Sequence, residues 1–483
     1  MAGGAAGPMP ASVNPFKTRL MPKEYYSAYA LVTSLFFLWG FCYGLLDVLN
    51  KHFQDVLNIS KLESTGLQVA YFGIGYFLFS PIAGEVLKRY GYKKCIIMGL
   101  CLYSLGAILF WPVAHFAGKS SNNAIFGGFV VCTGVVACGL ATLEVCANSY
   151  VSCMPPAEPA AFRLLFSQSF NGVASFIGPF IASKYFFTGE HANSLTTVQF
   201  VYLAVAAMGA IIAVIFAIVR LPEVSEAELQ EQAEVAVANM PEAQRNQLQK
   251  PFYKQIRPIL GAVAQFAYVG AQVTIGTFFI NYATDSADFS KPKASNFLSY
   301  ALIIFTVFRF VFTGLLSIFS APLLLAVCAI LCTVFTVLTA VIHGTVGVIC
   351  LMVIYAMMAI QYPVIFVLST EGLGRHTRRA AALLVCGVSG GAVFPPIQGA
   401  LAIKFGTRQS FWLPVPAFIY VVGFSLWIWK TKGCYILVAN ELNNQAKLRG
   451  EVRTERVSDY ENDLSEKKIA EDEQVEVVDT VKY

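Results

Sequence analysis

Long apolar segments alternate with short polar ones along the whole chain. A helix of about 20 apolar residues crosses the hydrocarbon core of a bilayer, so windows of that length identify candidate spans. Twelve such windows are found, at 29–53, 67–87, 95–113, 127–150, 164–187, 198–219, 259–282, 296–319, 323–343, 346–369, 381–403 and 411–429. The pattern predicts an all-α membrane protein with twelve transmembrane helices.

The spans fall into two groups of six, separated by the polar segment 221–257. Glycine and proline recur at matching places in spans five and eleven, at 172–179 and 387–395, which indicates two pseudo-symmetric halves. This pattern predicts five regions. They are an N-terminal tail (1–28), a six-helix half (29–220), a linker (221–257), a second six-helix half (258–430) and a largely disordered, polar tail (431–483).

Composition and charge agree with a membrane protein and exclude several other classes. Only 13% of the 483 residues are charged, against about 25% in soluble proteins. The net charge of +5 does not indicate a nucleic-acid partner. The 12 cysteines and 5 histidines are dispersed, with no spacing typical of a metal site, and no nucleophile motif is present. We therefore expect no enzyme activity, cofactor or metal.

Lysine and arginine are more frequent on one side of the predicted spans, which fixes their orientation. Clusters such as 88–94 and 375–379 share that side with the basic N-terminal segment. Because basic loops stay in the cytoplasm, both termini are predicted to be cytoplasmic, in the plasma membrane. The glycosylation sequon at Asn58 falls on the opposite side, close to the first span, and its use stays open.

Asp47 and Glu144 each lie inside an apolar segment. A carboxylate at the bilayer centre costs about 2.5–3.5 kcal/mol on insertion scales, so such residues face a wet cavity or a partner and mark functional sites. Trp39, Tyr43 and Asp47 are spaced four apart and share one helix face. A ring beside an acid suits a sugar, although packing by Trp39 and a structural bond at Asp47 remain alternatives.

Glu144 and Asn148 also share a helix face, on span four. A carboxylate in a low-dielectric cavity binds a proton readily, because desolvation disfavours its charged form. We therefore predict that Glu144 carries a proton, with Asp47 as a coupling partner. The alternative is a permanent ion pair between Glu144 and Arg309, the arginine inside an apolar span.

Amide and aromatic residues recur inside several other spans. Amides in membrane helices often bond neighbouring helices, and for any single residue this interpretation is preferred. Several together, each near an aromatic ring, indicate a cavity for a polyhydroxylated ligand. The residues are Gln168, Asn171, Gln265, Tyr268, Gln272, Gln361 and Tyr362.

Together, these residues resemble the pattern of a known family. The chain resembles the fucose:proton symporters (fucose permeases) of the major facilitator superfamily, and their fungal members most closely. The likeness extends from Phe36 to about Trp429. Its carriers are the segments 36–39 with Asp47, 84–94, 110–112, 143–148, 163–171, 268–272 and 360–363.

The resemblance implies a twelve-helix, alternating-access carrier with the major facilitator fold. Asp47 matches an acid needed for transport, Glu144 the acid thought to take up the proton, Gln168 and Asn171 substrate contacts, and Trp39 a cavity aromatic. Bacterial fucose permeases have asparagines where this chain has Tyr43, Gly44 and Leu46. The substrate is therefore L-fucose or a related hexose.

The predicted function is proton-coupled monosaccharide symport by a monomer in the lipid bilayer, with sugar and protons as partners. A non-transporting sugar sensor of the same fold is one rival, which would signal through the C-terminal tail. A metabolite or drug exporter is another, and its pocket should be mostly apolar.

Overall fold

The structure is a computed structural model that describes residues 21–57, 66–116, 121–155, 159–186, 196–223, 227, 229–230, 233–234 and 250–441. Side chains are not described at 43, 45–57, 178–186 and 196–197. Most of the predicted linker, most of each terminal tail and Asn58 lie outside these residues. The five predicted domain limits stay predictions.

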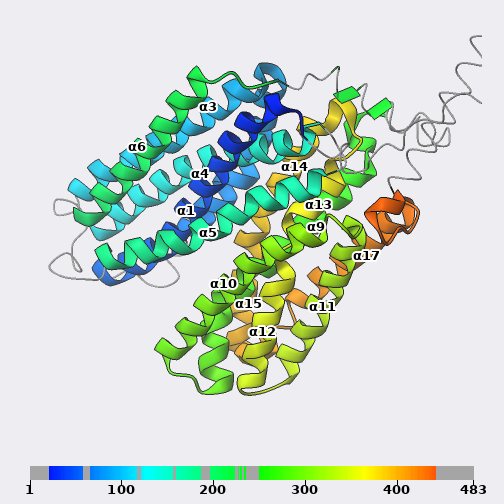
Figure 1. Ribbon diagram of the computed structural model, residues 1–483. Helices are drawn as coiled ribbons and strands as arrows, with labels where there is room; N and C mark the ends of the chain where they lie inside the picture. Colours follow the sequence, from blue (N-terminus) through cyan, green and yellow to red (C-terminus); the bar gives the residue numbers. More distant parts are fainter. Residues whose placement is uncertain are drawn as a thin grey trace, which may run out of the picture.

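The described chain is built of helices (Figure 1). In the first half they are η2 (Lys23–Tyr25), α1 (Tyr26–Leu57), η3 (Ala70–Phe79), α3 (Ser80–His115), α4 (Asn122–Cys153), α5 (Ala160–Phe186) and α6 (Thr196–Ile218). In the second half they are η6 (Phe252–Lys254), α9 (Ile256–Ala287), α10 (Lys291–Leu315), α11 (Ala321–Val341), α12 (Thr345–Met358), α13 (Gln361–Thr370), η7 (Gly374–His376), α14 (Thr377–Cys386), η8 (Gly387–Ser389), α15 (Gly390–Phe405), α16 (Thr407–Ser410) and α17 (Pro414–Thr431).

Ten described helical stretches are long and apolar enough to cross a membrane. One of them, Gly66–His115, is a bent pair of spans, because the backbone turns at Gly91 with φ 80° and ψ 177°. A positive φ of this size costs little conformational energy only for glycine, so Gly91 separates the second span from the third. Helix α5, whose side chains are described only as far as Ile177, supplies the remaining span. The twelve predicted spans are confirmed.

Several spans are interrupted near proline or glycine. Helices α12 and α13 form one span broken at Ala359 and Ile360, because the ring of Pro363 crowds the carbonyl four residues earlier. Helices α14 and α15 are joined by the 3₁₀ turn η8, which begins at Gly387. Within the second span, η3 is a π-helix, in which each N–H bonds five residues back.

Each half forms its own bundle, and the two meet along a few helices (Figure 1). Helices α1, α3, α4, α5 and α6 pack together, as do α9–α12, α15 and α17. Between the halves, α5 contacts α10 and α13, while α14 contacts α3 and α4. Glycine permits the last approach, since Gly84 on α3 lies directly against Ala382 on α14. Having an even number of spans, the chain begins and ends its helical core on the same side, here called the terminal side.

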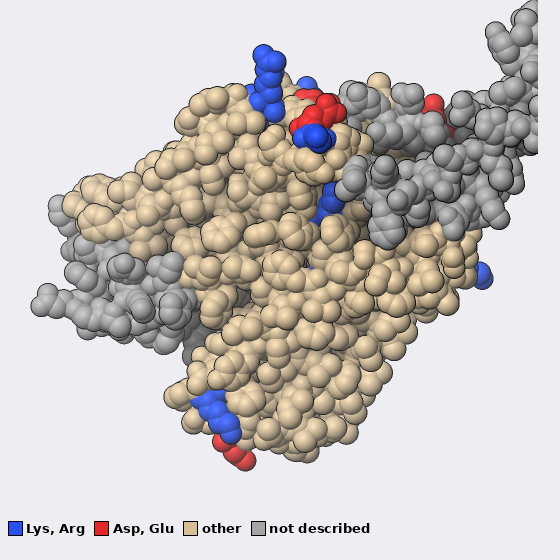
Figure 2. All heavy atoms as spheres, in the orientation of Figure 1, with Lys and Arg blue, Asp and Glu red and all other residues tan. Residues whose placement is uncertain are grey.

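On the face shown in Figure 2, the described charged side chains gather at the two ends of the bundles, with an uncharged belt between them. On the terminal side, Glu85 pairs with Arg89 at 3.0 Å and with Arg379 of the other half at 3.4 Å. Glu371 pairs with Arg257 at 3.3 Å and with Lys432 at 2.7 Å. Burial acts to raise the pKa of Glu371, but Lys432 and Arg257 hold that pKa below its usual range. The apolar belt is that of a multi-pass membrane protein.

Candidate functional site

Glu144 lies in the middle of the molecule, on a stretch of α4 that is buried throughout from Thr142 to Asn148. Its side chain is 3% exposed. The hydroxyl of Tyr362, on α13 of the other half, donates a hydrogen bond to Glu144 Oε1. Tyr76 and Asn148 also lie near the carboxylate. The predicted proton carrier therefore sits where the two halves meet.

A chain of amides continues from this carboxylate. Asn148 Nδ2 donates to the Tyr362 hydroxyl at 3.3 Å, and Gln168 Nε2 on α5 donates to Asn148 Oδ1 at 3.3 Å. Asn171, one turn further along α5, donates to the carbonyl of Phe36 on α1 at 3.3 Å. The structure thus brings together Glu144, Asn148, Gln168 and Asn171 of the first half with Tyr362 of the second.

Arg309 enters this network from α10 of the second half. Its Nη1 donates to the carbonyl of Gln168 and, at 3.2 Å, to Asn171 Oδ1. Its guanidinium also lies 4.6 Å from the centre of the Phe305 ring. In this conformation Arg309 and Glu144 form no ion pair, because each is bound to neutral groups instead. The permanent pairing considered from the sequence is therefore not observed.

Trp39 is half-buried and lies inside the bundle. Its Nε1 donates to the hydroxyl of Tyr71 on η3 at 3.1 Å, and its ring lies 6.5 Å from that of Tyr362. The hydroxyls of Tyr71 and Tyr76 are 3.4 Å apart. Trp39 therefore contributes to the central network and is not an interfacial anchor. Tyr71 and Tyr76 did not emerge from the sequence, because a spacing of five does not share a face of an α-helix.

Among the described residues, three buried side-chain atoms of the network have no protein partner. They are Glu144 Oε2, Gln168 Oε1 and Arg309 Nε. Buried polar atoms in native proteins almost always find a hydrogen-bond partner. These atoms therefore mark places where a ligand hydroxyl or water completes the network.

The amides of the second half are placed differently. Gln361 donates to Cys332 Sγ at 3.1 Å and to the carbonyl of Met357 at 3.3 Å, so it turns toward α11. Tyr268 donates to the carbonyl of Met358 at 2.8 Å. Gln265 is fully buried beside Gly387, with both amide atoms unpartnered. Gln272 lies on the same face of α9 as Gln265 and is only partly buried.

Asp47 and Tyr43 belong to α1, but their side chains lie outside the described residues. The backbone places Asp47 eight residues after Trp39 on the same helix face. Their predicted roles in sugar binding, and that of Asp47 in proton coupling, stay predictions.

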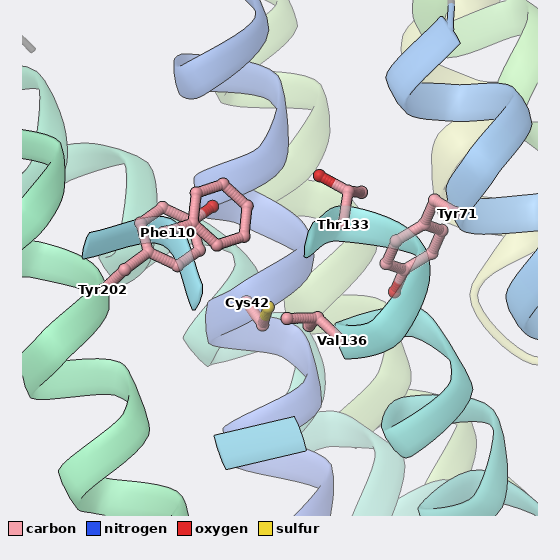
Figure 3. A pocket seen from close by; sticks show the side chains of 6 residues that line it. All are labelled: Cys42, Tyr71, Phe110, Thr133, Val136 and Tyr202. Atoms are coloured by element: carbon pink, nitrogen blue, oxygen red, sulfur yellow. The ribbon is translucent and has the colours of Figure 1, made fainter. Parts of the chain in front are cut away.

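A separate small cavity lies inside the first half (Figure 3). Six side chains from five helical elements surround it: Cys42, Tyr71, Phe110, Thr133, Val136 and Tyr202. It has room for about one water molecule. A hexose does not fit there, so it is distinct from the site between the halves.

The fold and the central network are those of a secondary transporter. The chain belongs to the Major Facilitator Superfamily, whose family model matches residues 32–387. This confirms the predicted fold, and with it the two pseudo-symmetric six-helix halves typical of that fold.

Sequence comparison narrows the relationship further. The chain is 30% identical to a glucose/galactose transporter of Brucella abortus, over 86% of this chain and 97% of that protein. It is also 30% identical to the L-fucose-proton symporter of Haemophilus influenzae, over 85% of this chain and 99% of that protein. The predicted membership of the fucose permease family is thereby confirmed, and these relatives are transporters rather than enzymes. Both are bacterial, so the closer likeness to fungal members stays a prediction.

A solved structure gives the same result. The transporter FucP, crystallised in its outward conformation, matches with a TM-score of 0.70 and 27% identity, covering 84% of this chain and 99% of that one. A proton:xylose symporter, XylE, matches at 17% identity with a TM-score of 0.61, which supports the fold alone.

Proposed function

We propose that this protein is a proton-coupled monosaccharide symporter of the plasma membrane, with both termini in the cytoplasm. The central network carries the proposal: one buried carboxylate, one buried arginine and three amides lie where the two halves meet. The relatives that transport L-fucose with protons, or glucose and galactose, support the substrate class. L-fucose or a related hexose is the substrate, and the working unit is a monomer.

Glu144 takes up the coupled proton in this mechanism. Its Oε1 accepts from Tyr362 of the opposite half, while its Oε2 has no protein partner. A carboxyl group in such a buried place gains from protonation, since the neutral acid costs less to desolvate than the anion. Proton binding at Oε2 leaves the bond to Tyr362 intact, and proton loss leaves an anion that favours a wetter arrangement of the two halves.

The sugar binds between the halves, on the same network. Its hydroxyls pair with Gln168 Oε1 and with the amides of Asn148 and Asn171, and its apolar face packs on Trp39. Asp47 and Tyr43 of α1, and Gln272, Gln265, Tyr268, Gln361 and Tyr362 of the second half, complete the proposed site. Of these, Gln361 and Tyr268 act indirectly, by holding the helices around the site, because both bond to neighbouring helices.

Alternating access follows from where the halves touch. On the terminal side α14 packs against α3 and α4, so that side is closed in this conformation. If the termini are cytoplasmic, the site is closed to the cytoplasm, as in the outward conformation of FucP. Sugar hydroxyls that replace the bonds of Arg309 and Tyr362 loosen the central links and allow the halves to rock.

The test uses purified protein in liposomes with a pH-sensitive dye outside. Each of a panel of hexoses, deoxyhexoses and N-acetylhexosamines is added, with L-fucose and D-glucose first. Symport predicts alkalinisation outside with at least one sugar. Sugar binding without any flux identifies a sensor, and flux of apolar compounds alone identifies an exporter; either result overturns the proposal.

A further inference from the structure

The π-helix η3 aligns two tyrosines that an ordinary helix would separate. In an α-helix, with 3.6 residues per turn, residues five apart point about 140° away from each other. In η3 the bonds span five residues, so Tyr71 and Tyr76 come to lie one above the other. Their rings are 5.4 Å apart and their hydroxyls 3.4 Å apart. Both side chains are almost completely buried.

The two hydroxyls connect the Glu144 carboxylate with the small cavity inside the first half. Tyr76 lies beside the Glu144 carboxylate. Tyr71 lines the small cavity inside the first half, together with Thr133 (Figure 3). On α4, Thr133 precedes Glu144 by eleven residues, which is about 16 Å at the helical rise per residue. The pair therefore lies between the cavity and the carboxylate.

The cavity has the chemistry to hold water. Thr133 Oγ1 lines it, is buried, and has no protein partner. A buried hydroxyl that lacks a hydrogen bond is costly, and internal water is the usual remedy where there is room for it.

The donors along this path have a consistent direction. The indole N–H of Trp39 can only donate, so Tyr71 accepts in that bond. The hydroxyl hydrogen of Tyr71 can then point to Tyr76, and that of Tyr76 to Glu144. A proton that travels through the first half reaches the Glu144 carboxylate from the side that Tyr362 does not cover, because Tyr362 lies on the side that faces the other half.

We infer that Tyr71 and Tyr76 relay the coupled proton from water in the small cavity to Glu144, apart from the route of the sugar. A hydronium ion in the cavity gives a proton to Tyr71 Oη, which passes its own hydrogen to Tyr76 Oη, which passes its hydrogen to a carboxylate oxygen of Glu144. One O–H bond breaks and one forms at each tyrosine. The net change is one proton lost from water and one gained by Glu144. This inference rests on the proposed function.

The experiment compares Tyr76→Phe, Tyr71→Phe and Thr133→Val with the wild type in liposomes. Each variant keeps the volume of the side chain and removes one hydroxyl. Sugar-driven proton uptake is measured with the pH dye, and exchange of labelled for unlabelled sugar is measured separately, because exchange needs no net proton transfer. Tyr29→Phe is the matched control, since Tyr29 bonds the carbonyl of Arg163 away from the path.

The relay predicts that proton uptake falls at least about tenfold in the two phenylalanine variants and less in Thr133→Val, while exchange persists. Tyr29→Phe should match the wild type in both measurements. Wild-type proton uptake in both phenylalanine variants would overturn the relay alone, and so would an equal loss of exchange, which would assign the tyrosines to sugar binding. Absence of sugar-driven proton uptake in the wild type would overturn the proposed function as well.

Discussion

The two halves touch in the interior, around Glu144 and Arg309, and again on the terminal side, and the two contacts differ in kind. At the centre, Glu144 and Arg309 are almost fully buried and bond across the halves to neutral groups. On the terminal side, Glu85 and Arg379 form an ion pair with side chains 40% and 43% exposed. A buried charge needs every bond it has, whereas water readily replaces an exposed pair. The centre should therefore control transport and the terminal side only its conformational balance.

The largest effect is expected at the carboxylate. Glu144→Gln keeps the shape and the bond to Tyr362 but cannot take up a proton. Active sugar accumulation should fall by at least about a hundredfold, while sugar exchange persists. Uptake against a gradient in liposomes measures the first and labelled exchange the second. Accumulation at the wild-type level would remove Glu144 from the proton mechanism.

The arginine of the same network comes next. Arg309→Met leaves the Gln168 carbonyl and Asn171 Oδ1 without their donor and should cost about 3 kcal/mol of stability. Sugar affinity should weaken by about tenfold or more. Thermal unfolding in detergent and equilibrium sugar binding measure the two effects. Arg408→Met is the control, because Arg408 also bonds backbone carbonyls, at Ala340 and Val341, but is partly exposed. Equal effects of both variants would contradict the prediction.

The close contact between Gly84 and Ala382 on the terminal side should affect the conformational balance more than the ion pair there. Gly84→Val pushes a side chain into Ala382 of the other half and should disfavour the closed terminal side by about 1–3 kcal/mol. Cysteine labelling on the terminal side should increase. Gly127→Ala serves as the control, since nothing lies within 4 Å of its added carbon. Unchanged labelling would show that this contact does not hold the halves together.

The smallest effect is expected for the exposed pair. Glu85→Gln removes the bridges to Arg89 and Arg379, and ion pairs this exposed contribute little to stability, because water and salt screen them. Transport rates should change less than about threefold, and added salt should reduce even that difference. Rates measured at low and high ionic strength test this. A loss as large as that of Glu144→Gln would reverse the ranking of the two contacts.

Much of this protein could be predicted from hydropathy and spacing. The twelve spans, their grouping and the positions of Glu144 and Asn148 follow from sequence, because a bilayer imposes helix length and makes each buried charge conspicuous. The pairing of Gln168 with Asn148 was not predicted, although each residue was. Amides are common in membrane helices, and spacing within one helix says nothing of the neighbour that each one faces.

Only the tertiary structure decided which side chains pair with one another across helices. It directs Tyr362 to Glu144 and Gln361 to Cys332, although the two residues are adjacent in sequence. It places the Arg309 guanidinium in hydrogen-bond contact with Asn171 rather than with Glu144. It also aligns Tyr71 with Tyr76 through a π-helix, a choice that depends on packing against α4 and has no period in the sequence. The sequence by itself determined which residues are costly to bury, and the fold decided which groups offset that cost.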